Sequence, residues 1–100
     1  MNKIEYLLVC LNEECSEIIK LTDKALRFGL NDSHPSADNP GTNLENIMHE
    51  LNDLMGVCKM MVDEGVFKAE EIMNEGKMAQ KVEKIKRFMK YSAEKGVLEI

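Results

Sequence analysis

Five acidic side chains, four of them at matched places, stand in two apolar helical patterns of this 100-residue chain. The first pattern, "LNEECSEIIKL", carries Glu13, Glu14 and Glu17, and the second, "MHELNDLM", carries Glu50 and Asp53. At about 100° per residue, Glu14 lies inside the apolar arc of its helix, Glu17 at the edge of that arc and Glu13 beyond it. Glu50 lies inside the second arc and Asp53 at its edge. Each helix therefore places one acid within its apolar face and another three residues later on the same flank.

Carboxylates inside apolar faces need a positive partner, because an unpaired ionised carboxylate is very costly in a dry interior. No Lys or Arg lies inside either arc. A hard divalent cation fits better, since Mg²⁺ and Mn²⁺ take oxygen ligands and commonly bridge to substrate phosphates. For one helix alone, a solvated or ion-paired glutamate is the simpler explanation, but the same arrangement on two helices favours a metal site.

A di-iron carboxylate bundle is disfavoured. Such a centre would use Glu-x-x-His motifs. Here His49 precedes Glu50 instead of following it by three residues, and the first helical pattern has no His.

The first element that must position these acids is a helix predicted over about Lys3–Phe28. Asn2 can cap its start, with Glu5 three residues further on, and Gly29 can end it. A loop is predicted at about Leu30–Gly41, a segment that contains both prolines and has no periodicity.

A second helix is predicted to begin at Thr42, which forms a capping-box pattern with Glu45, and to stop near Gly65. The segment Val66–Gly76 fits either a short helix or a loop. A basic C-terminal helix is predicted over about Lys77–Ser92, where apolar residues recur with 4-3-4 spacing. No strand pattern appears, so we predict an all-α protein with a single helical domain over residues 1–100.

The cysteine content and the hydropathy of the chain indicate the cellular compartment to expect. The three cysteines are an odd number without C-x-x-C spacing, which fits reduced thiols in a cytoplasmic protein. Cys15 and Cys58 fall on apolar helical faces and are predicted to be core residues. No run of about 18 apolar residues is present, so no membrane span is expected.

Charge is unevenly distributed along the chain. The formal net charge is −5, with 15 acids and 6 bases in residues 1–76 but 3 acids and 7 bases in residues 77–100. This distribution argues against general nucleic-acid binding. It suits a site where a cation and an anionic small molecule meet.

The paired acidic motifs resemble a known family. "EECSE" (Glu13–Glu17) followed by "ELND" (Glu50–Asp53) is similar to the E-E-x-x-E … E-x-x-D signature of the MazG-like all-α nucleoside triphosphate pyrophosphohydrolases. "KALRFGL" and "VEKIKRFMKYS" also resemble small members of that family, including phage-encoded ones, so the resemblance covers most of the chain. The 32 residues between the two motifs are a departure from the pattern of the family. This departure puts substrate contacts made by the loop in question more than it does the metal site.

The resemblance implies Mg²⁺-dependent hydrolysis of a nucleoside triphosphate to the monophosphate and pyrophosphate, with Mn²⁺ as an alternative ion. It implies Glu14, Glu17, Glu50 and Asp53 as metal ligands. Glu17 and Glu13 are the candidate catalytic carboxylates. The role of Glu13 is left open: it is a proton acceptor, a partner of the metal ligands or simply an exposed side chain. The location would be the host cytoplasm if the chain is phage-encoded.

Basic side chains are needed to hold the phosphates that leave as pyrophosphate. The candidates are Lys24 and Arg27 near the end of the first helix, and Lys77, Lys81, Lys84 and Arg87 in one stripe of the third, with Tyr91 as a candidate partner of the base. An ordinary solvated basic face explains the stripe equally well. Favourable charge at a helix C-terminus explains Lys24 and Arg27 at least as well. The sequence does not say which nucleotide is used.

Assembly is predicted from the width of the apolar arcs. The arcs of the first two helices span roughly 180°, wider than the stripe of about 100° that a one-sided helix needs. A three-helix monomer cannot easily cover both, so we expect an antiparallel helical bundle completed by oligomerisation, as a homodimer or homotetramer. The alternative to an enzyme is a non-catalytic helical interaction or regulatory module derived from the same fold.

Overall fold

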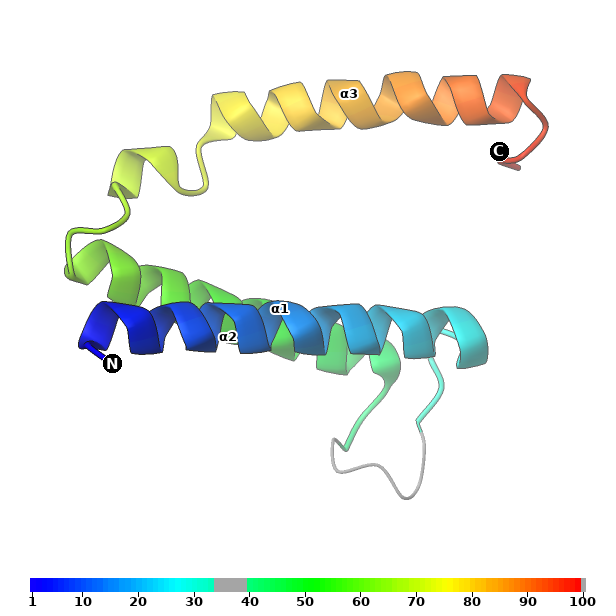
Figure 1. The fold of residues 1–100 in the computed structure, drawn as a ribbon. Coiled ribbons are helices and arrows are strands. Elements are labelled where there is room, and N and C mark those ends of the chain that lie inside the picture. The colour runs from blue at the N-terminus through cyan, green and yellow to red at the C-terminus, as the bar shows by residue number, and fades with distance from the viewer. Residues whose placement is uncertain (34–39, 100) are drawn as a thin grey trace. The chain divides into compact units, whose positions relative to one another are not determined.

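The computed structural model describes residues 1–33 and 40–99. These residues form α1 (Lys3–Phe28), α2 (Asn43–Asp63), the short 3₁₀ helix η1 (Ala69–Glu71) and α3 (Glu75–Glu94) (Figure 1). They contain no strand, which confirms the all-α prediction. None of the described helices has an apolar stretch able to cross a bilayer.

The chain divides into two compact units, Met1–Phe67 and Lys68–Ile100. Each unit is described by itself below. The prediction of one domain over residues 1–100 stays a prediction.

Helix α1 begins and ends where local chemistry predicts. The Asn2 Oδ1 accepts a hydrogen bond from the Glu5 backbone N–H at 2.8 Å, and Glu5 Oε2 accepts one from the Asn2 N–H at 3.0 Å. This reciprocal capping box satisfies two amides that the first turn leaves without helical partners. The helix closes at Gly29, whose φ of 101° is readily reached only by glycine. The predicted range Lys3–Phe28 is confirmed.

Helix α2 starts with a second capping box. The Glu45 N–H donates to Thr42 Oγ1 and the Thr42 N–H donates to Glu45 Oε1, both at 3.1 Å. The hydrogen bonds from Thr42 lower the pKa of the Glu45 carboxyl. The helix ends at Asp63, and Gly65 follows with a φ of 76°, as the predicted stop requires.

The two helices form an antiparallel hairpin (Figure 1). Lys3, at the start of α1, forms an ion pair with Glu64 at the end of α2. Among the described residues of the hairpin, the buried apolar side chains are Leu7 and Leu21 of α1 and Met61 of α2. Burial of such a side chain stabilises the fold by about 1.5–3 kcal/mol.

At the other end of the hairpin, three hydrogen bonds close the base of the connecting loop; we call them the clasp. The buried Asn43 side chain donates to the Gly29 carbonyl at 2.8 Å, and its backbone N–H donates to the Asp32 carbonyl at 2.9 Å. The Leu44 N–H donates to the Leu30 carbonyl at 2.9 Å. The described ends of the predicted loop, residues 30–33 and 40–41, are outside the helices, and the predicted residues 34–39 lie outside the described part.

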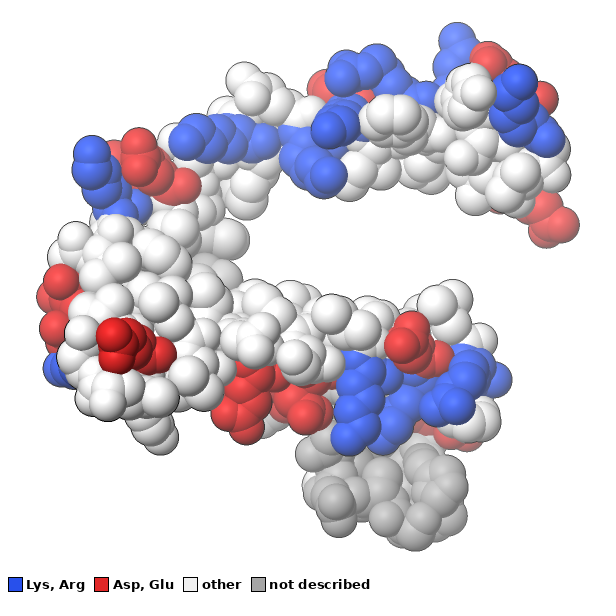
Figure 2. All heavy atoms as spheres, viewed as in Figure 1, with Lys and Arg blue, Asp and Glu red and all other residues white. Residues whose placement is uncertain are grey.

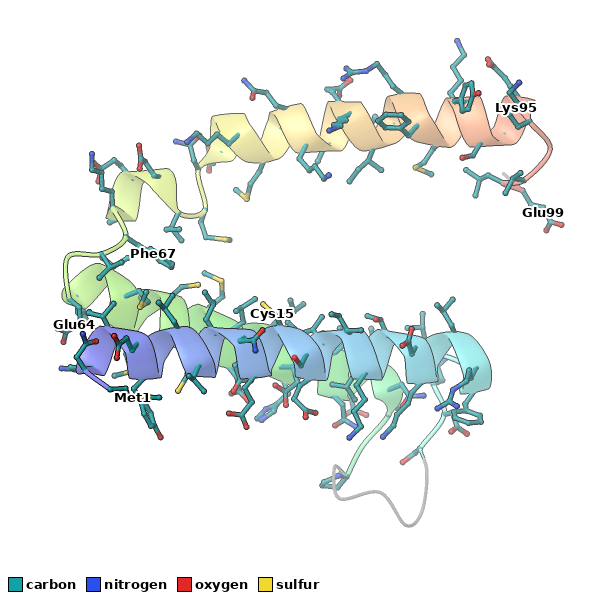
Figure 3. The ribbon with its side chains drawn as sticks, in the orientation of Figure 1. Met1, Cys15, Glu64, Phe67, Lys95 and Glu99 are labelled. Atoms are coloured by element: carbon teal, nitrogen blue, oxygen red, sulfur yellow. The ribbon has the colours of Figure 1, made fainter. Side chains whose placement is uncertain are left out.

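The prediction that Cys15 is a core residue is wrong for a single copy of the chain. Cys15, labelled on α1 in Figure 3, is exposed, and Cys58 is half-buried. Cys15 lies on the same side of its apolar arc as Leu8, which is 48% exposed, and Leu51 on the matching side of α2 is 45% exposed. Packing of two helices covers only the part of each arc that faces the other helix, so one side of both arcs is left uncovered.

The second unit holds η1 and α3. Helix α3 extends two residues beyond the predicted range at each end. Its earlier start has a local cause, because the Asn74 side chain accepts a hydrogen bond from the Lys77 N–H and caps the helix before Glu75. The ambiguous segment Val66–Gly76 contains η1 and the first turn of α3. The side chains in the apolar stripe of α3 are each 40–47% exposed: Met78, Val82, Ile85 and Met89.

Candidate metal centre

Carboxylates from two helices meet at the middle of the α1–α2 hairpin. Glu14 of α1 and Glu50 and Asp53 of α2 each offer an oxygen atom, and these atoms all lie within 4.8 Å of one another. We call these three residues the acidic cluster. Acidic side chains gather at this part of the hairpin next to a basic group nearer its loop end (Figure 2). The structure thus brings together three of the four acids that the helical spacing predicts as ligands.

One oxygen of the cluster has no partner. Glu14 and Glu50 are partly buried, whereas Asp53 is exposed. With the carboxyl groups ionised, the buried Glu50 Oε2 atom has no hydrogen-bond partner among the described residues. A buried acceptor without a partner costs about 1–3 kcal/mol, and more when it is charged. A hard cation bound here would meet that need, because all three donors are carboxylate oxygens, the ligands that Mg²⁺ and Mn²⁺ prefer.

The electrostatics of the cluster are unfavourable without a cation. Hydrogen bonding with the Glu50 carboxyl, partial burial and the charges of Glu50, Asp53 and Glu17 raise the pKa of Glu14 from 4.5 to about 7. A carboxyl group with this pKa is about half protonated at pH 7 and mostly protonated below that pH. A proton therefore takes the place of a positive partner when no metal is bound.

The other two predicted acids, Glu17 and Glu13, are not members of the cluster. Glu17 is partly buried and its charge acts on Glu14, but its carboxylate is not among the atoms within 4.8 Å of one another. Glu13 is exposed. Their predicted roles, as ligand or proton acceptor for Glu17 and as proton acceptor or partner for Glu13, stay predictions.

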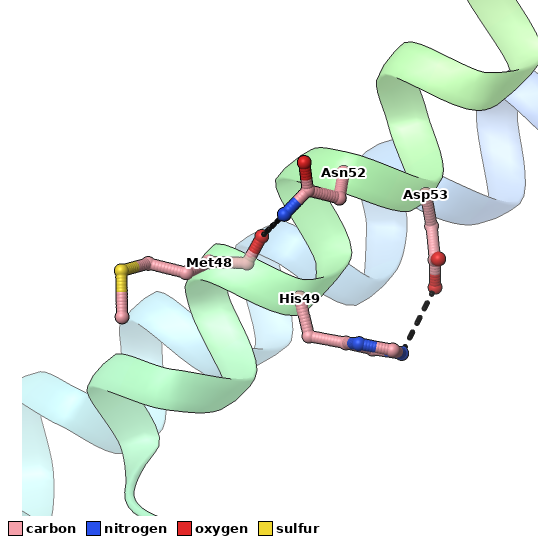
Figure 4. Close-up of polar contacts among 4 residues, drawn as sticks. All are labelled: Met48, His49, Asn52 and Asp53. Atoms are coloured by element: carbon pink, nitrogen blue, oxygen red, sulfur yellow. Dashed lines mark hydrogen bonds and ion pairs between the residues drawn. The ribbon is translucent and has the colours of Figure 1, made fainter.

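His49 is the neighbour that the sequence analysis did not assign to the site. Its Nε2 atom lies 3.5 Å from Asp53 Oδ2, one helical turn away, and the pair is ionic when the imidazole is protonated (Figure 4). The side chain of His49 is 74% exposed and that of Asp53 is 44% exposed. The i, i+4 spacing of His49 and Asp53 is the signal that could have found this contact.

Two of the predicted phosphate-binding residues lie on the same hairpin as the cluster. Lys24 is partly buried, and Arg27 lies over the Phe28 ring at 4.9 Å from its centroid. Arg27 also lines an open surface pocket of about 450 Å³ with Lys20, Asp23 and Leu26. Lys20 is a basic residue of this surface that the sequence analysis did not select.

The remaining predicted substrate residues belong to the second unit. Lys77, Lys81, Lys84, Arg87 and Tyr91 are exposed on α3. Lys84, Arg87 and Tyr91 line a pocket of about 320 Å³ together with Phe88. These residues form a basic and aromatic surface, and their action on phosphates stays a prediction because the acidic cluster belongs to the other unit.

Comparison of the chain with family models, with curated proteins and with solved structures found no match. The geometry of the cluster and the resemblance of its motifs are therefore the grounds for a function.

The raised pKa of Glu14 predicts how stability changes with pH in the metal-free protein. Its pKa is about 7 in the fold and 4.5 ordinarily, so between these values the folded state binds more protons than the unfolded state. The stabilisation from this proton is complete below about pH 4.5 and is lost as the pH rises through about 7. Urea unfolding in the presence of a chelator should therefore show a falling contribution to the unfolding free energy across this range.

The Glu14→Gln variant is the control, because an amide does not titrate. Its unfolding free energy should fall less between pH 4.5 and 7 than that of the unsubstituted chain. Equal pH dependence in both proteins would contradict the assignment of the effect to Glu14.

Proposed function

We propose that the acidic cluster binds a divalent cation of the Mg²⁺ class and that the protein hydrolyses a nucleoside triphosphate to the monophosphate and pyrophosphate. The observation that carries the metal site is that oxygen atoms of Glu14, Glu50 and Asp53 lie within 4.8 Å of one another, and that Glu50 also has a buried oxygen with no hydrogen-bond partner in the described part of the chain. The choice of substrate and bond rests on the resemblance of "EECSE" and "ELND" to the MazG-like signature.

The proposed ligands are the three residues of the cluster, with Glu17 as the fourth. A divalent cation held by them supplies positive charge to the phosphate oxygens and makes a nearby water more acidic. Mn²⁺ suits the same oxygen donors as Mg²⁺.

Carboxylates next to the cluster supply the proton acceptor in this proposal. Hydrolysis requires a water oxygen to bond to the α-phosphorus while the bond to the bridging α–β oxygen breaks. The water loses a proton, and Glu17 is the better placed acceptor because it is partly buried and lies close enough for its charge to affect Glu14. Glu13 is the alternative acceptor.

Pyrophosphate leaves with a high negative charge, which basic side chains can stabilise. Lys24 and Arg27 are carried by the same helix as Glu14, and the basic surface of α3 supplies the second group of candidates. Tyr91 and Phe88 offer aromatic rings in the α3 pocket that could stack on a base.

The proposal includes a homodimer or homotetramer. Large apolar side chains are exposed on the same side of both arcs of the hairpin and along α3. A second copy could cover these faces and complete a helical bundle.

The decisive experiment is product analysis with a panel of nucleotides, covering ribonucleoside and deoxyribonucleoside triphosphates and triphosphates with altered bases. With Mg²⁺ present, phosphorus NMR should show pyrophosphate and a nucleoside monophosphate as primary products of at least one member. The reason is that the family implied by the two motifs cleaves the α–β bond. Orthophosphate and a diphosphate as primary products would refute the bond choice, and absence of turnover with the whole panel would favour the non-catalytic interaction module.

A further inference from the structure

The two acidic flanks place two acids in the same layout but differ in the residue just before the first of these acids. "EECSE" on α1 and "HELND" on α2 place their second and fifth residues at equivalent points, an acid inside the apolar arc and an acid at its edge. The first residue of each string lies one turn before the edge acid. This residue is Glu13 on α1 and His49 on α2.

The difference changes what the edge acid faces. On α1, Glu13 is four residues before Glu17, and two like charges at this spacing repel each other. On α2, the His49 Nε2 atom lies 3.5 Å from Asp53 Oδ2 (Figure 4). Asp53 belongs to the acidic cluster, whereas Glu17 does not. The edge acid that has an imidazole beside it is the one whose carboxylate reaches the cluster.

We infer that His49 is a positioning residue for metal binding, holding the Asp53 carboxylate toward Glu14 and Glu50. The inference rests on the proposed metal site. His49 is not itself assigned as a ligand, because its ring nitrogens are not among the atoms that lie within 4.8 Å of one another. Its role is to hold the Asp53 carboxylate through the contact between His49 Nε2 and Asp53 Oδ2, because carboxylates that bind metals are commonly held by a neighbouring donor.

The test is titration of the purified chain with Mn²⁺ by isothermal calorimetry, comparing His49→Ala with His49→Gln. Glutamine can place an N–H close to the position of the imidazole Nε2, whereas alanine cannot. His49→Ala should weaken Mn²⁺ binding about tenfold, the lower end of the effect expected for a partner of a metal ligand. His49→Gln should keep most of the affinity.

Asn52→Ala is the matched control on the same helix. Asn52 is exposed and its side chain donates to the Met48 carbonyl, away from the pair formed by His49 and Asp53 (Figure 4). This variant should bind Mn²⁺ like the unsubstituted chain. Melting with a chelator should be similar for all four proteins, since His49 is largely exposed.

Several results would overturn the inference. Unchanged or tighter Mn²⁺ binding by His49→Ala excludes the positioning role. Equal losses in the alanine and glutamine variants also exclude it. Pulsed EPR of bound Mn²⁺ should show no directly bound nitrogen, and a bound nitrogen would make His49 a ligand instead.

Measured Mn²⁺ binding distinguishes failure of this inference from failure of the proposed metal site. If the unsubstituted chain binds Mn²⁺ and His49→Ala binds it equally well, the positioning role fails and the metal site stands. If the unsubstituted chain binds no Mn²⁺, the proposed metal site fails and the inference fails with it. Nucleotide hydrolysis does not enter the comparison.

Discussion

Glu50→Gln should reduce nucleotide hydrolysis by about a hundredfold or more, comparable to the loss of one charge-stabilising group from other active sites. Glu50 supplies the partly buried carboxylate whose Oε2 atom has no hydrogen-bond partner among the residues that the structure describes. The substitution removes a charge that a cation needs and leaves the shape of the side chain nearly unchanged. Hydrolysis of the nucleotide identified by the panel, measured as pyrophosphate release at low Mg²⁺ concentration, tests this expectation.

The same variant should lose its response to metal in a thermal melt. For the unsubstituted chain, Mn²⁺ at a hundredfold excess over Kd should add about 2.7 kcal/mol to the unfolding free energy. For a protein of this size that corresponds to a rise of about 10 °C or more in Tm. Without metal, Glu50→Gln should melt at a higher temperature than the unsubstituted chain, because one of the mutually repelling charges around Glu14 is gone.

Asp63→Asn is the control for charge, since Asp63 is an exposed acid at the end of the same helix. It should retain both turnover and the metal-dependent melting shift. Near-normal activity of Glu50→Gln at low metal concentration would show that Glu50 is not a ligand.

The unsubstituted protein should be a dimer or tetramer at low micromolar concentration, and Leu8→Glu should convert it to a smaller species. Leu8 lies on the uncovered side of the α1 arc, beside Cys15, and Leu51 occupies the matching side of α2. If a second copy covers this side, a charge at Leu8 costs about 3 kcal/mol or more in association, from lost apolar burial and an unpaired carboxylate. Multi-angle light scattering after size-exclusion chromatography measures the mass directly.

Val9→Glu provides a closely matched control. Val9 is 50% exposed and Leu8 is 48% exposed, but the side chains of consecutive helical residues point in different directions. Val9→Glu should therefore keep the mass of the unsubstituted protein. A monodisperse, fully active monomer before any substitution would exclude both the assembly and a site shared between copies, and would leave the acidic cluster unaffected.

The limits of the first two helices could be predicted because their signals are local. Asn2 with Glu5 and Thr42 with Glu45 form their capping boxes within single helical turns. Such bonds depend on spacing alone. The start of α3 was missed because Gly76, a poor helix former, lies in its first turn. The start of α3 is set instead by the Asn74 side chain, which caps the helix.

The candidate site was only partly predictable for a different reason. Helical angles give the direction in which Glu14 and Glu50 leave their helices, and the structure brings these two together. Angles do not give side-chain reach, so Glu17 and Asp53 had equivalent predicted positions although only Asp53 belongs to the cluster. Periodicity also gives the width of an apolar arc, but it does not say how many neighbouring helices cover that arc. For this reason Cys15, which lies on an apolar face, was wrongly predicted to be a core residue.

The clasp gives the hairpin a further property, which concerns how its sequence can change. Its hydrogen bonds join Gly29, Leu30 and Asp32 directly to Asn43 and Leu44, on the helical side of residues 34–39. Once the ends of a loop are fixed in this way, each doubling of the length between them costs only about 0.6 kcal/mol in closure entropy. Insertions and deletions in this segment can therefore accumulate while the helical register, and with it the separation of the two acidic motifs in space, is kept.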